Sequence, residues 1–308
     1  MTPAIEIDGL VKEYGEHRAL DRLDLRVEPG SVFGFLGANG AGKTTTLRIL
    51  LALSRPTSGT ARVFGHIPGD AEARGLVGYC PDVPGFFSWM TAQDVMRHAA
   101  DLFGLPKNIA QARIGELLEL TGLAEVKSKV GGYSRGMRQR LGLAQALINA
   151  PRLLMLDEPT SALDPLGRRA VLDLLAELRG RTTVFFSTHL LSDVERVCDT
   201  VAIIDRGHLV TQGPLADVRA EYGTHDGRLI VEVDDAARLR EALSRQPWVV
   251  RIADGKVAGT LVLTTTGHDE ATACLPALVA SLGLRLLRLN PAESTLEDIF
   301  VSTVGVAR

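Results

Sequence analysis

The segment GANGAGKT at residues 37–44 constrains the fold of this chain more than any other part of it. It fits the pattern G-x-x-x-x-G-K-[ST], and it lies between a strand-like apolar run at residues 32–36 and a helix-like run at residues 47–51. Glycines let the backbone bend so that successive N–H groups point at one anion, and the following helix adds the partial positive charge of its first turn. The sequence therefore predicts a strand, a phosphate-binding loop and a helix in succession.

Each position of this phosphate loop has a chemical role in the prediction. We expect Lys43 to reach the β- and γ-phosphates of a nucleotide, and the Thr44 hydroxyl to bind Mg²⁺. The other candidate nucleotide contacts are Gly37, Asn39, Gly40, Gly42 and Thr45. A glycine-rich turn that happens to precede a lysine is the alternative interpretation. The loop alone leaves GTPases, kinases, RecA-like motors and transporter ATPases open, although the N-K-x-D motif of guanine readers is missing from the sequence.

Length and composition bound the class of protein. The 308 residues are enough for two domains, and a net charge of −3 gives no basic footprint, so we expect no nucleic-acid partner. No apolar run approaches the ~18 residues that span a bilayer, and the N-terminal segment lacks the basic start of a signal peptide. The three cysteines show no C-x-x-C spacing, which is typical of reduced thiols in a cytosolic protein.

Residues 1–218 alternate strand-like and helix-like segments, which predicts an α/β fold with a mostly parallel sheet. Besides the strand before the phosphate loop, the predicted strands are 4–7, 23–27, 153–156, 182–187 and 201–204. Asp164 and Pro165 predict a helix start, as N-cap and first-turn residue. Residues 88–150 show helical spacing only, and we expect them to form a helical subdomain within the nucleotide-binding domain. The helices predicted there are 92–103, 108–121 and 136–149.

The pattern changes after Gly213 and Pro214. The remaining elements are predicted in the order β-α-β-β-α-β, followed by a short helix from Ser294. The strands are 228–233, 249–252, 261–265 and 284–289, and the helices are 236–244 and 270–282. This order predicts a small α+β domain of the ferredoxin-like type over residues 219–308.

A second motif decides among the nucleotide-binding classes. Residues 133–137 read YSRGM and lie ahead of the apolar run 153–156, which ends in Asp157 and Glu158. This arrangement resembles ABC-type ATPases, in which the signature motif is most commonly L-S-G-G-Q. The resemblance implies that Asp157 holds Mg²⁺, directly or through water, and that Glu158 orients and polarises the water that attacks ATP.

Further motifs follow in the order of that family. Tyr14 lies where the family has its adenine-stacking aromatic, the segment SALD at residues 161–164 resembles the D-loop, and His189 resembles the switch histidine that contacts the γ-phosphate. The resemblance covers residues 4 to about 215 and rests on six ordered motifs. It implies an ABC-type nucleotide-binding domain with a helical insert, and ATP as the bound nucleotide.

The resemblance also implies a second ATPase subunit. A loop of Ser134 and Gly136 at a helix start is another anion site, which the helical insert holds away from the phosphate loop of its own chain. In the family two copies pair head to tail, and each ATP lies between the phosphate loop of one copy and the signature of the other. Ser134, Gly136 and the D-loop Asp164 are therefore candidate nucleotide contacts, and a homodimer is the simpler expectation. Pairing with a sister ATPase stays open.

Three residues depart from the family pattern. The family usually has Gln where this chain has Asp82, at the end of the strand that enters the helical insert. A carboxylate can ligate Mg²⁺ directly or through water, so Asp82 is a candidate for both the metal site and catalysis. Arg135 replaces the first glycine of the signature pair, and Met137 replaces its closing glutamine. The form Y-S-x-G-M is similar to the subfamily that pairs with ABC-2-type permeases.

A membrane partner is indicated by the loop that follows Asp82. Phe86, Phe87 and Trp89 are costly to leave in water, and in the family this region receives a helix of the permease. Packing inside the helical insert is the alternative. Residues 294–300, STLEDIF, resemble the ending of ABC-2-type exporter ATPases. We therefore predict the ATP-hydrolysing subunit of an ABC exporter, bound to the cytoplasmic face of the cell membrane through its permease.

The sequence disfavours two other functions. A soluble ABC ATPase of translation or DNA maintenance is disfavoured because the chain has one phosphate loop and no long heptad run. A regulatory module without turnover is disfavoured because Lys43, Asp157, Glu158 and His189 are all present. The transported substrate cannot be read from this chain, since the permease lines the path, and the direction of transport follows from the subfamily resemblance alone.

Overall fold

The computed structural model describes residues 2–161, 163–222, 229–255, 257, 259–291, 296–297 and 299–300. The chain forms two compact units, Met1–Leu215 and Ala216–Arg308. Among the helices in these ranges, none combines the length and the apolar character that a bilayer crossing requires.

The first unit alternates strands and helices along the chain. Its strands are β1 (Ile5–Tyr14), β2 (His17–Val27), β3 (Val32–Leu36), β4 (Ser58–Val63), β5 (Val77–Cys80), β6 (Leu153–Asp157), β7 (Thr183–Thr188), β8 (Thr200–Asp205) and β9 (His208–Pro214). Its helices are α1 (Lys43–Leu50), α2 (Ala71–Leu76), α3 (Ala92–Leu102), α4 (Lys107–Leu120), α5 (Arg135–Leu147), α6 (Pro165–Glu177) and α7 (Leu191–Val197). A further helix, α8 (Leu215–Tyr222), starts at the last residue of this unit.

A six-stranded sheet in the order β5-β6-β7-β3-β8-β9 forms the centre of the first unit. Neighbouring strands are parallel except for β8 and β9. Every residue of β3, β6 and β7 is buried, as expected for central strands of a parallel sheet. The predicted α/β fold is thus confirmed. In the register, Leu36 pairs with Thr188 and Asp157 pairs with Ser187, so the carboxyl ends of these three strands meet at one edge of the sheet.

A second sheet, in the order β2-β1-β4, is antiparallel, and its strands are longer than the predicted 4–7 and 23–27. Strand β1 continues through Gly9, which has a φ of 54° and lies where the register with β2 shifts. The Asp24 carboxylate accepts a hydrogen bond from the backbone N–H of Gly9 at 2.7 Å. A residue type that usually ends a strand therefore forms an irregularity inside a longer one.

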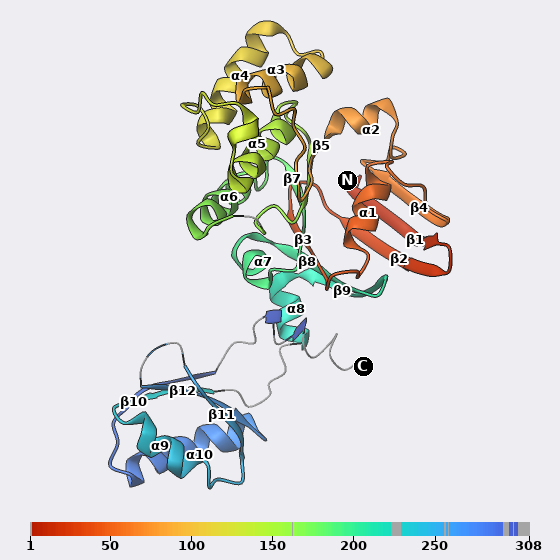
Figure 1. Ribbon diagram of the computed structural model, residues 1–308. Coiled ribbons are helices and arrows are strands. Elements are labelled where there is room, and N and C mark those ends of the chain that lie inside the picture. Colours follow the sequence, from red (N-terminus) through yellow and green to blue (C-terminus); the bar gives the residue numbers. More distant parts are fainter. Residues whose placement is uncertain are drawn as a thin grey trace. The chain divides into compact units, whose positions relative to one another are not determined.

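Between β5 and β6 the chain forms α3, α4 and α5, which confirms the helices predicted in this region. They share a hydrophobic core, to which Met96, Leu118 and Leu141 contribute buried side chains. Figure 1 shows the three helices clustered at one end of the first unit, apart from β1, β2 and β4. A capping box of Thr91 and Asp94 starts α3, because each side chain accepts a hydrogen bond from the backbone N–H of the other.

The second unit contains an antiparallel sheet in the order β11-β12-β10-β13. Its elements are β10 (Leu229–Val233), α9 (Ala236–Leu243), β11 (Val249–Asp254), β12 (Thr260–Thr265), α10 (His268–Ser281) and β13 (Leu286–Pro291). The helices pack on the sheet through a core that includes Leu239, Trp248 and Leu275. The start of the helix predicted from Ser294 lies outside the described residues, and residues 296–297 and 299–300 are helical.

Candidate functional site

The phosphate loop connects β3 to α1, which confirms the predicted strand, loop and helix. Gly42 has a φ of +112°, and a Cβ there would lie 2.7 Å from the Leu20 side chain and 2.8 Å from the Ala19 carbonyl oxygen. A Cβ at Gly37 would lie 2.6 Å from the carbonyl oxygen of Ile204. Both positions need glycine, because the loop packs directly against the backbone of β2 and β8.

A pocket of about 570 Å³ opens beside this loop. The predicted site residues that line it are Tyr14, Asn39, Gly40, Gly42, Lys43, Thr44, Thr45, Asp82, Asp157 and Glu158. The lining also includes His17, Arg48 and Tyr79, which no motif in the sequence indicated. Segments from β1, β3, β5 and β6 therefore meet around one cavity, which we call the phosphate-loop pocket.

Lys43 is the buried cation of this pocket, with 6% of its surface exposed. Its ammonium group donates hydrogen bonds to the carbonyl oxygens of Gly37 at 2.7 Å and Ala38 at 3.3 Å, and it lies 3.7 Å from Glu158 Oε1. Burial lowers the pKa of Lys43, although the neighbouring carboxylates of Glu158 and Asp157 oppose this shift. Because desolvation disfavours the charged form of Lys43, an anionic ligand that pairs with the ammonium group would bind favourably.

Asp157 is the buried anion of the same pocket, also with 6% exposed. Its Oδ1 accepts a hydrogen bond from Ser187 Oγ at 3.1 Å, and its Oδ2 accepts one from Thr44 Oγ1 at 3.3 Å. Burial raises the pKa of Asp157, although these two hydrogen bonds oppose the shift. The hydroxyl of Thr44 and the carboxylate of Asp157 therefore lie side by side, as the prediction of a shared cation requires.

Glu158 and His189 each directly follow one of two neighbouring strands, β6 and β7. His189 Nδ1 lies 2.9 Å from Glu158 Oε2, and the same oxygen accepts a hydrogen bond from Thr188 Oγ1 at 3.3 Å. Glu158 has a φ of 49°, a left-handed conformation that is unfavourable for residues other than glycine and that occurs often at functional sites. Its carboxylate thus lies between Lys43 and His189.

Tyr14 lies at the rim of the pocket and is 45% exposed. The ammonium group of Lys12 lies 4.6 Å from the centre of its ring, and its hydroxyl lies 3.4 Å from Ser54 Oγ. An aromatic ring with this exposure at the rim of a pocket can stack on a planar group such as a nucleotide base. Lys12 was not predicted, although residues two positions apart in a strand lie on the same face.

Asp82 lines the pocket but makes its contacts elsewhere. Its Oδ1 accepts a hydrogen bond from Ser161 Oγ at 3.0 Å and lies 3.4 Å from Arg135 Nη2. Two of the three residues that depart from the family pattern, Asp82 and Arg135, therefore contact each other. This ion pair links the end of β5 with the start of α5.

The signature residues are not part of the phosphate-loop pocket. Ser134 is the N-cap of α5 and accepts a hydrogen bond from the Met137 N–H at 3.2 Å. Asp164 is the N-cap of α6 and accepts one from the Gly167 N–H at 2.7 Å, so the predicted helix start is confirmed. Together with Gly136 these residues line a separate hollow of about 660 Å³, which we call the signature hollow. Within the described part of the chain, the two cavities share no lining residue.

Comparisons with known proteins agree with this geometry. The model of the ABC transporter family matches residues 20–161. The uncharacterized ABC transporter ATP-binding protein YxlF of Bacillus subtilis is 40% identical over 304 residues, which are 97% of this chain and 99% of that protein. The bacitracin transport ATP-binding protein BcrA of Bacillus licheniformis is 36% identical over 311 residues, which are 99% of this chain and 98% of that protein.

A solved structure described as the ATP binding subunit of an ABC transporter aligns with a TM-score of 0.67 and 29% identity, over 71% of this chain and 93% of that chain. The likeness to the two bacterial relatives extends through both units and is not limited to the phosphate loop. GTPases, kinases and RecA-like motors are thereby excluded. The chain belongs to the ATP-binding proteins of ABC transporters, and it is an ATP-hydrolysing subunit of an exporter of this family.

Proposed function

We propose that this subunit works as a head-to-tail homodimer, in which each ATP lies between the phosphate-loop pocket of one copy and the signature hollow of the other. The separation of the two cavities carries this proposal. Ser134 and Gly136 form an anion-binding helix start that lines no part of the chain's own phosphate-loop pocket. Since one chain has both halves, a symmetric pair of copies would form two complete sites.

Within such a site the pocket residues divide the chemistry. Lys43 binds the β- and γ-phosphates, whose negative charge offsets the cost of burying its ammonium group. Glu158, between Lys43 and His189, orients and polarises the attacking water. His189 contacts the γ-phosphate from the end of β7, and Tyr14, exposed at the rim of the pocket, stacks on the adenine.

The donor set of the pocket fits Mg²⁺. Thr44 and Asp157 present a hydroxyl and a carboxylate within 3.3 Å of each other, and hard oxygen donors of this kind suit the ion. No cluster of three His, Cys, Asp or Glu side chains that could hold a metal occurs among the described residues, so phosphate oxygens and water would complete the shell. When bound, Mg²⁺ neutralises charge that develops on the phosphates. Asp82 lines the same pocket and would join the shell if it leaves Arg135.

Mixing two inactive variants tests the dimer. Lys43→Ala disables the phosphate-loop pocket, and Gly136→Asp adds a carboxylate to the signature hollow while suiting the first turn of α5. Each variant alone should have no ATPase activity. In a head-to-tail dimer of the two, one site combines the intact halves of both copies, so activity should return on mixing. A mixture that stays inactive, although the chains associate, would overturn the proposal.

We also propose that the permease docks beside the loop that follows Asp82. Phe87 and Trp89 are 60% and 61% exposed and their rings stack 5.4 Å apart, whereas Phe86 is partly buried against the core of the helical region. Of the three predicted docking residues, two are thus available for a partner. An exposed aromatic pair of this kind is typical of interface cores.

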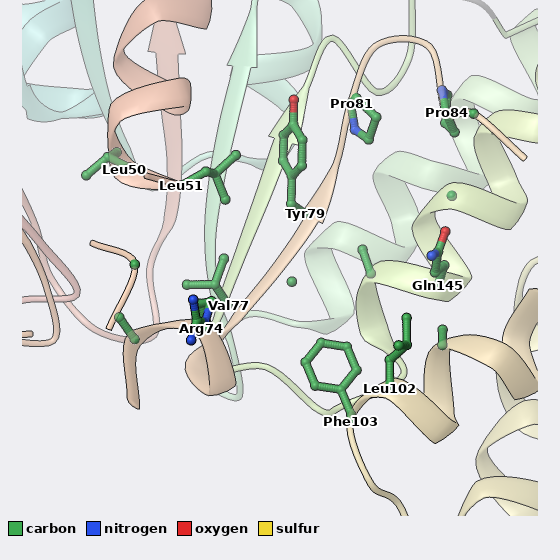
Figure 2. A pocket seen from close by; sticks show the side chains of 17 residues that line it. Leu50, Leu51, Arg74, Val77, Tyr79, Pro81, Pro84, Leu102, Phe103 and Gln145 are labelled. Carbon is green, nitrogen blue, oxygen red and sulfur yellow. The ribbon is translucent and has the colours of Figure 1, made fainter. Parts of the chain in front are cut away.

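A hollow of about 380 Å³ lies near this loop and adds to the docking surface. Figure 2 shows Leu51, which follows α1, and Phe103, which follows α3, on opposite sides of it, and Tyr79 of β5 also lines it. Tyr79 and Pro81 line both this hollow and the phosphate-loop pocket. A permease segment seated here would therefore touch the same short stretch of chain as the nucleotide.

Purification from detergent-solubilised membranes tests the membrane partner. Tagged Glu158→Gln protein, held with ATP, should retain a stoichiometric polytopic protein, and Phe87→Ser with Trp89→Ser should release it. Val250→Ser is the control, because it removes an equally exposed apolar side chain from the second unit. Recovery of ribosomal or DNA-associated proteins without a membrane protein would favour the soluble ABC ATPases. Peripheral binding at the cytoplasmic face of the membrane follows if the permease is found.

For the accessory domain, we propose that residues 219–308 have a ferredoxin-like fold. The order β10-α9-β11-β12-α10-β13 and the antiparallel sheet order β11-β12-β10-β13 support this assignment. Its separate hydrophobic core, with Leu239 and Leu275 fully buried, shows that the elements pack on one another.

A further inference from the structure

A second buried carboxylate lies close to the nucleotide site, on α7. Asp193 has 2% of its side chain exposed. Its Oδ1 accepts a hydrogen bond from Arg168 Nε at 2.7 Å and lies 2.6 Å from Arg168 Nη2, and its Oδ2 accepts a hydrogen bond from Thr160 Oγ1 at 2.6 Å. Arg168 also donates to Ser192 Oγ at 2.9 Å. The cluster joins α6, α7 and the 158–164 loop, and none of these side chains has a part in the function proposed above.

Stability alone does not account for such a pair. The cost of desolvating two charges cancels most of their attraction, so well-packed apolar side chains would stabilise the fold as well. What the pair provides is geometry, because Arg168 and Thr160 donate from fixed directions to one carboxylate. The cluster therefore fixes where α7 lies relative to the 158–164 loop.

The loop and the segment after β7 are held together at two places. Glu158, the first residue of the loop, contacts His189 at 2.9 Å, and Thr160 contacts Asp193. His189 lies in the link between the end of β7 at Thr188 and the start of α7, and 45% of its side chain is exposed. Because this link has only two residues, 189 and 190, the position of α7 affects where the imidazole lies.

We propose that Asp193, held by Arg168 and Thr160, is a positioning residue that fixes His189 relative to Glu158 and the 158–164 loop. The kinetic consequence rests on the proposed role of His189 at the γ-phosphate. The physical connection continues beyond the pair, since Ser161, next to Thr160, donates a hydrogen bond to Asp82. A displacement of His189 and α7 would therefore also change the position of the 158–164 loop, which ends at the signature hollow.

Variants of Thr160 with nearly the same shape test whether its hydrogen bond to Asp193 positions His189. Thr160→Val removes the hydroxyl donor, and Thr160→Ser restores it. We expect Thr160→Val to lower kcat by up to about 100-fold, because a small misplacement of a reacting group has effects of this size. The KM for ATP should be unchanged, and Thr160→Ser should keep nearly the kcat of the unmutated protein. Thr183→Val is the control, since Thr183 is 1% exposed at the opposite end of β7 and accepts a hydrogen bond from the Gly30 N–H.

A double-mutant cycle separates positioning from general weakening of the fold. In a His189→Ala background Thr160→Val should lower kcat no further, because it acts through the missing imidazole. Additive losses, or an equal loss with Thr183→Val, would overturn the inference and leave the proposed function intact.

Hydrogen exchange tests the structural role of the hydrogen bond between Thr160 and Asp193 without requiring ATP hydrolysis. In the nucleotide-free protein, Thr160→Val should speed amide exchange in the 158–164 loop and in residues 189–193, whereas Thr183→Val should not. Unchanged exchange in both segments would overturn the inference even if the chain hydrolysed no ATP. Absence of hydrolysis by the unmutated protein would instead count against the proposed function, and faster exchange would still support the structural role of this hydrogen bond.

Discussion

The phosphate-loop pocket and the signature hollow are built in opposite ways. In the pocket, Lys43 and Asp157 are almost fully buried. Burial lowers the pKa of Lys43 and raises that of Asp157, so it favours the neutral form of each side chain. In the hollow, Ser134 and Asp164 are exposed, and each is satisfied by a backbone N–H at the start of its own helix. The phosphate-loop pocket holds its charges at a cost in desolvation free energy, whereas the exposed and hydrogen-bonded groups of the signature hollow carry almost no such cost.

The phosphate-loop pocket therefore gains more free energy from binding ATP than the signature hollow does. Desolvation of the buried charges of Lys43 and Asp157 raises the free energy of the empty pocket, and a phosphate and its cation would offset that cost. The capped helix starts of the signature hollow are complete without a ligand and form a ready surface. Such a division fits a site in which one half binds the nucleotide first and the other half closes over it.

The largest effect is expected inside the pocket. Glu158→Gln keeps the shape of the side chain but removes the group that polarises water, so kcat should fall about 10²–10⁴-fold while ATP remains bound. Phosphate release measures the rate, and light scattering with ATP should show a trapped dimer. Glu241→Gln, which changes an exposed carboxylate of the second unit, should leave kcat unchanged. If Glu158→Gln hydrolyses ATP at the unmutated rate, the role of Glu158 is wrong.

At the rim of the pocket the expected effect is smaller. Tyr14→Ala removes a stacking surface worth about 1–3 kcal/mol, so the KM for ATP should rise roughly 5- to 150-fold. Because stacking contributes equally before and during the reaction, kcat should change little. Tyr14→Phe keeps the ring and loses only the 3.4 Å contact with Ser54, so it is the matched control. An equal rise in KM for both variants would show that the hydroxyl, and not the ring, binds the nucleotide.

Removal of the buried anion should stabilise the nucleotide-free protein. The folded pKa of Asp157 is raised above its ordinary value of 3.8, so the carboxyl favours the folded state at acidic pH, and this contribution is lost as the pH rises through the folded pKa. Asp157→Asn should therefore have a higher Tm than the unmutated protein at neutral pH, and the difference should shrink as the pH falls. Thermal unfolding over a pH series measures it. A lower Tm at neutral pH would mean that the hydrogen bonds of Asp157 outweigh its desolvation.

What could be predicted from the sequence has local causes. The phosphate loop needs glycines between a strand and a helix, and Asp164 with Pro165 forms a helix start through a hydrogen bond to the Gly167 N–H, three residues away. The apolar run of β6 is fully buried, and its carboxyl end delivers Asp157 and Glu158 to the pocket. Each of these features depends on residues close together in the chain.

What the sequence did not predict depends on contacts between distant segments. Strand β4 lies at a sheet edge and is mostly exposed, so it lacks the alternation that predicts a strand. Strand β9 is also at an edge and ends in Gly213 and Pro214, which favour a turn. Thr160 and Asp193 are 33 positions apart, and only the pairing of β6 with β7 brings them together. The partial burial of Phe86 beside the exposed Phe87 has the same kind of cause.

The smallest effect is expected at the ion pair of Asp82, which lines the phosphate-loop pocket, and Arg135, which lines the signature hollow. Both side chains are exposed, at 44% and 61%, and the charged atoms are 3.4 Å apart, so their coupling in the unfolding free energy should be about 0.2–1 kcal/mol. A double-mutant cycle of Asp82→Asn and Arg135→Gln, measured by urea unfolding without nucleotide, gives this value, and added salt should reduce it. The exposed pair of Arg245 and Glu241 in the second unit is the control.

The same cycle, repeated on the KM for ATP, shows how far the two cavities are independent. If Asp82 turns toward the cation when ATP binds, it must leave Arg135, and Arg135→Gln should then lower the KM slightly by removing the competitor. The control pair should show coupling in unfolding but none in KM, since it lies outside the unit that binds nucleotide. A coupling free energy between Asp82 and Arg135 well above 1 kcal/mol would mean that the phosphate-loop pocket and the signature hollow are strongly coupled within one chain. The two cavities could then no longer be treated as a charged pocket and an independent, preformed hollow, because this ion pair would link them.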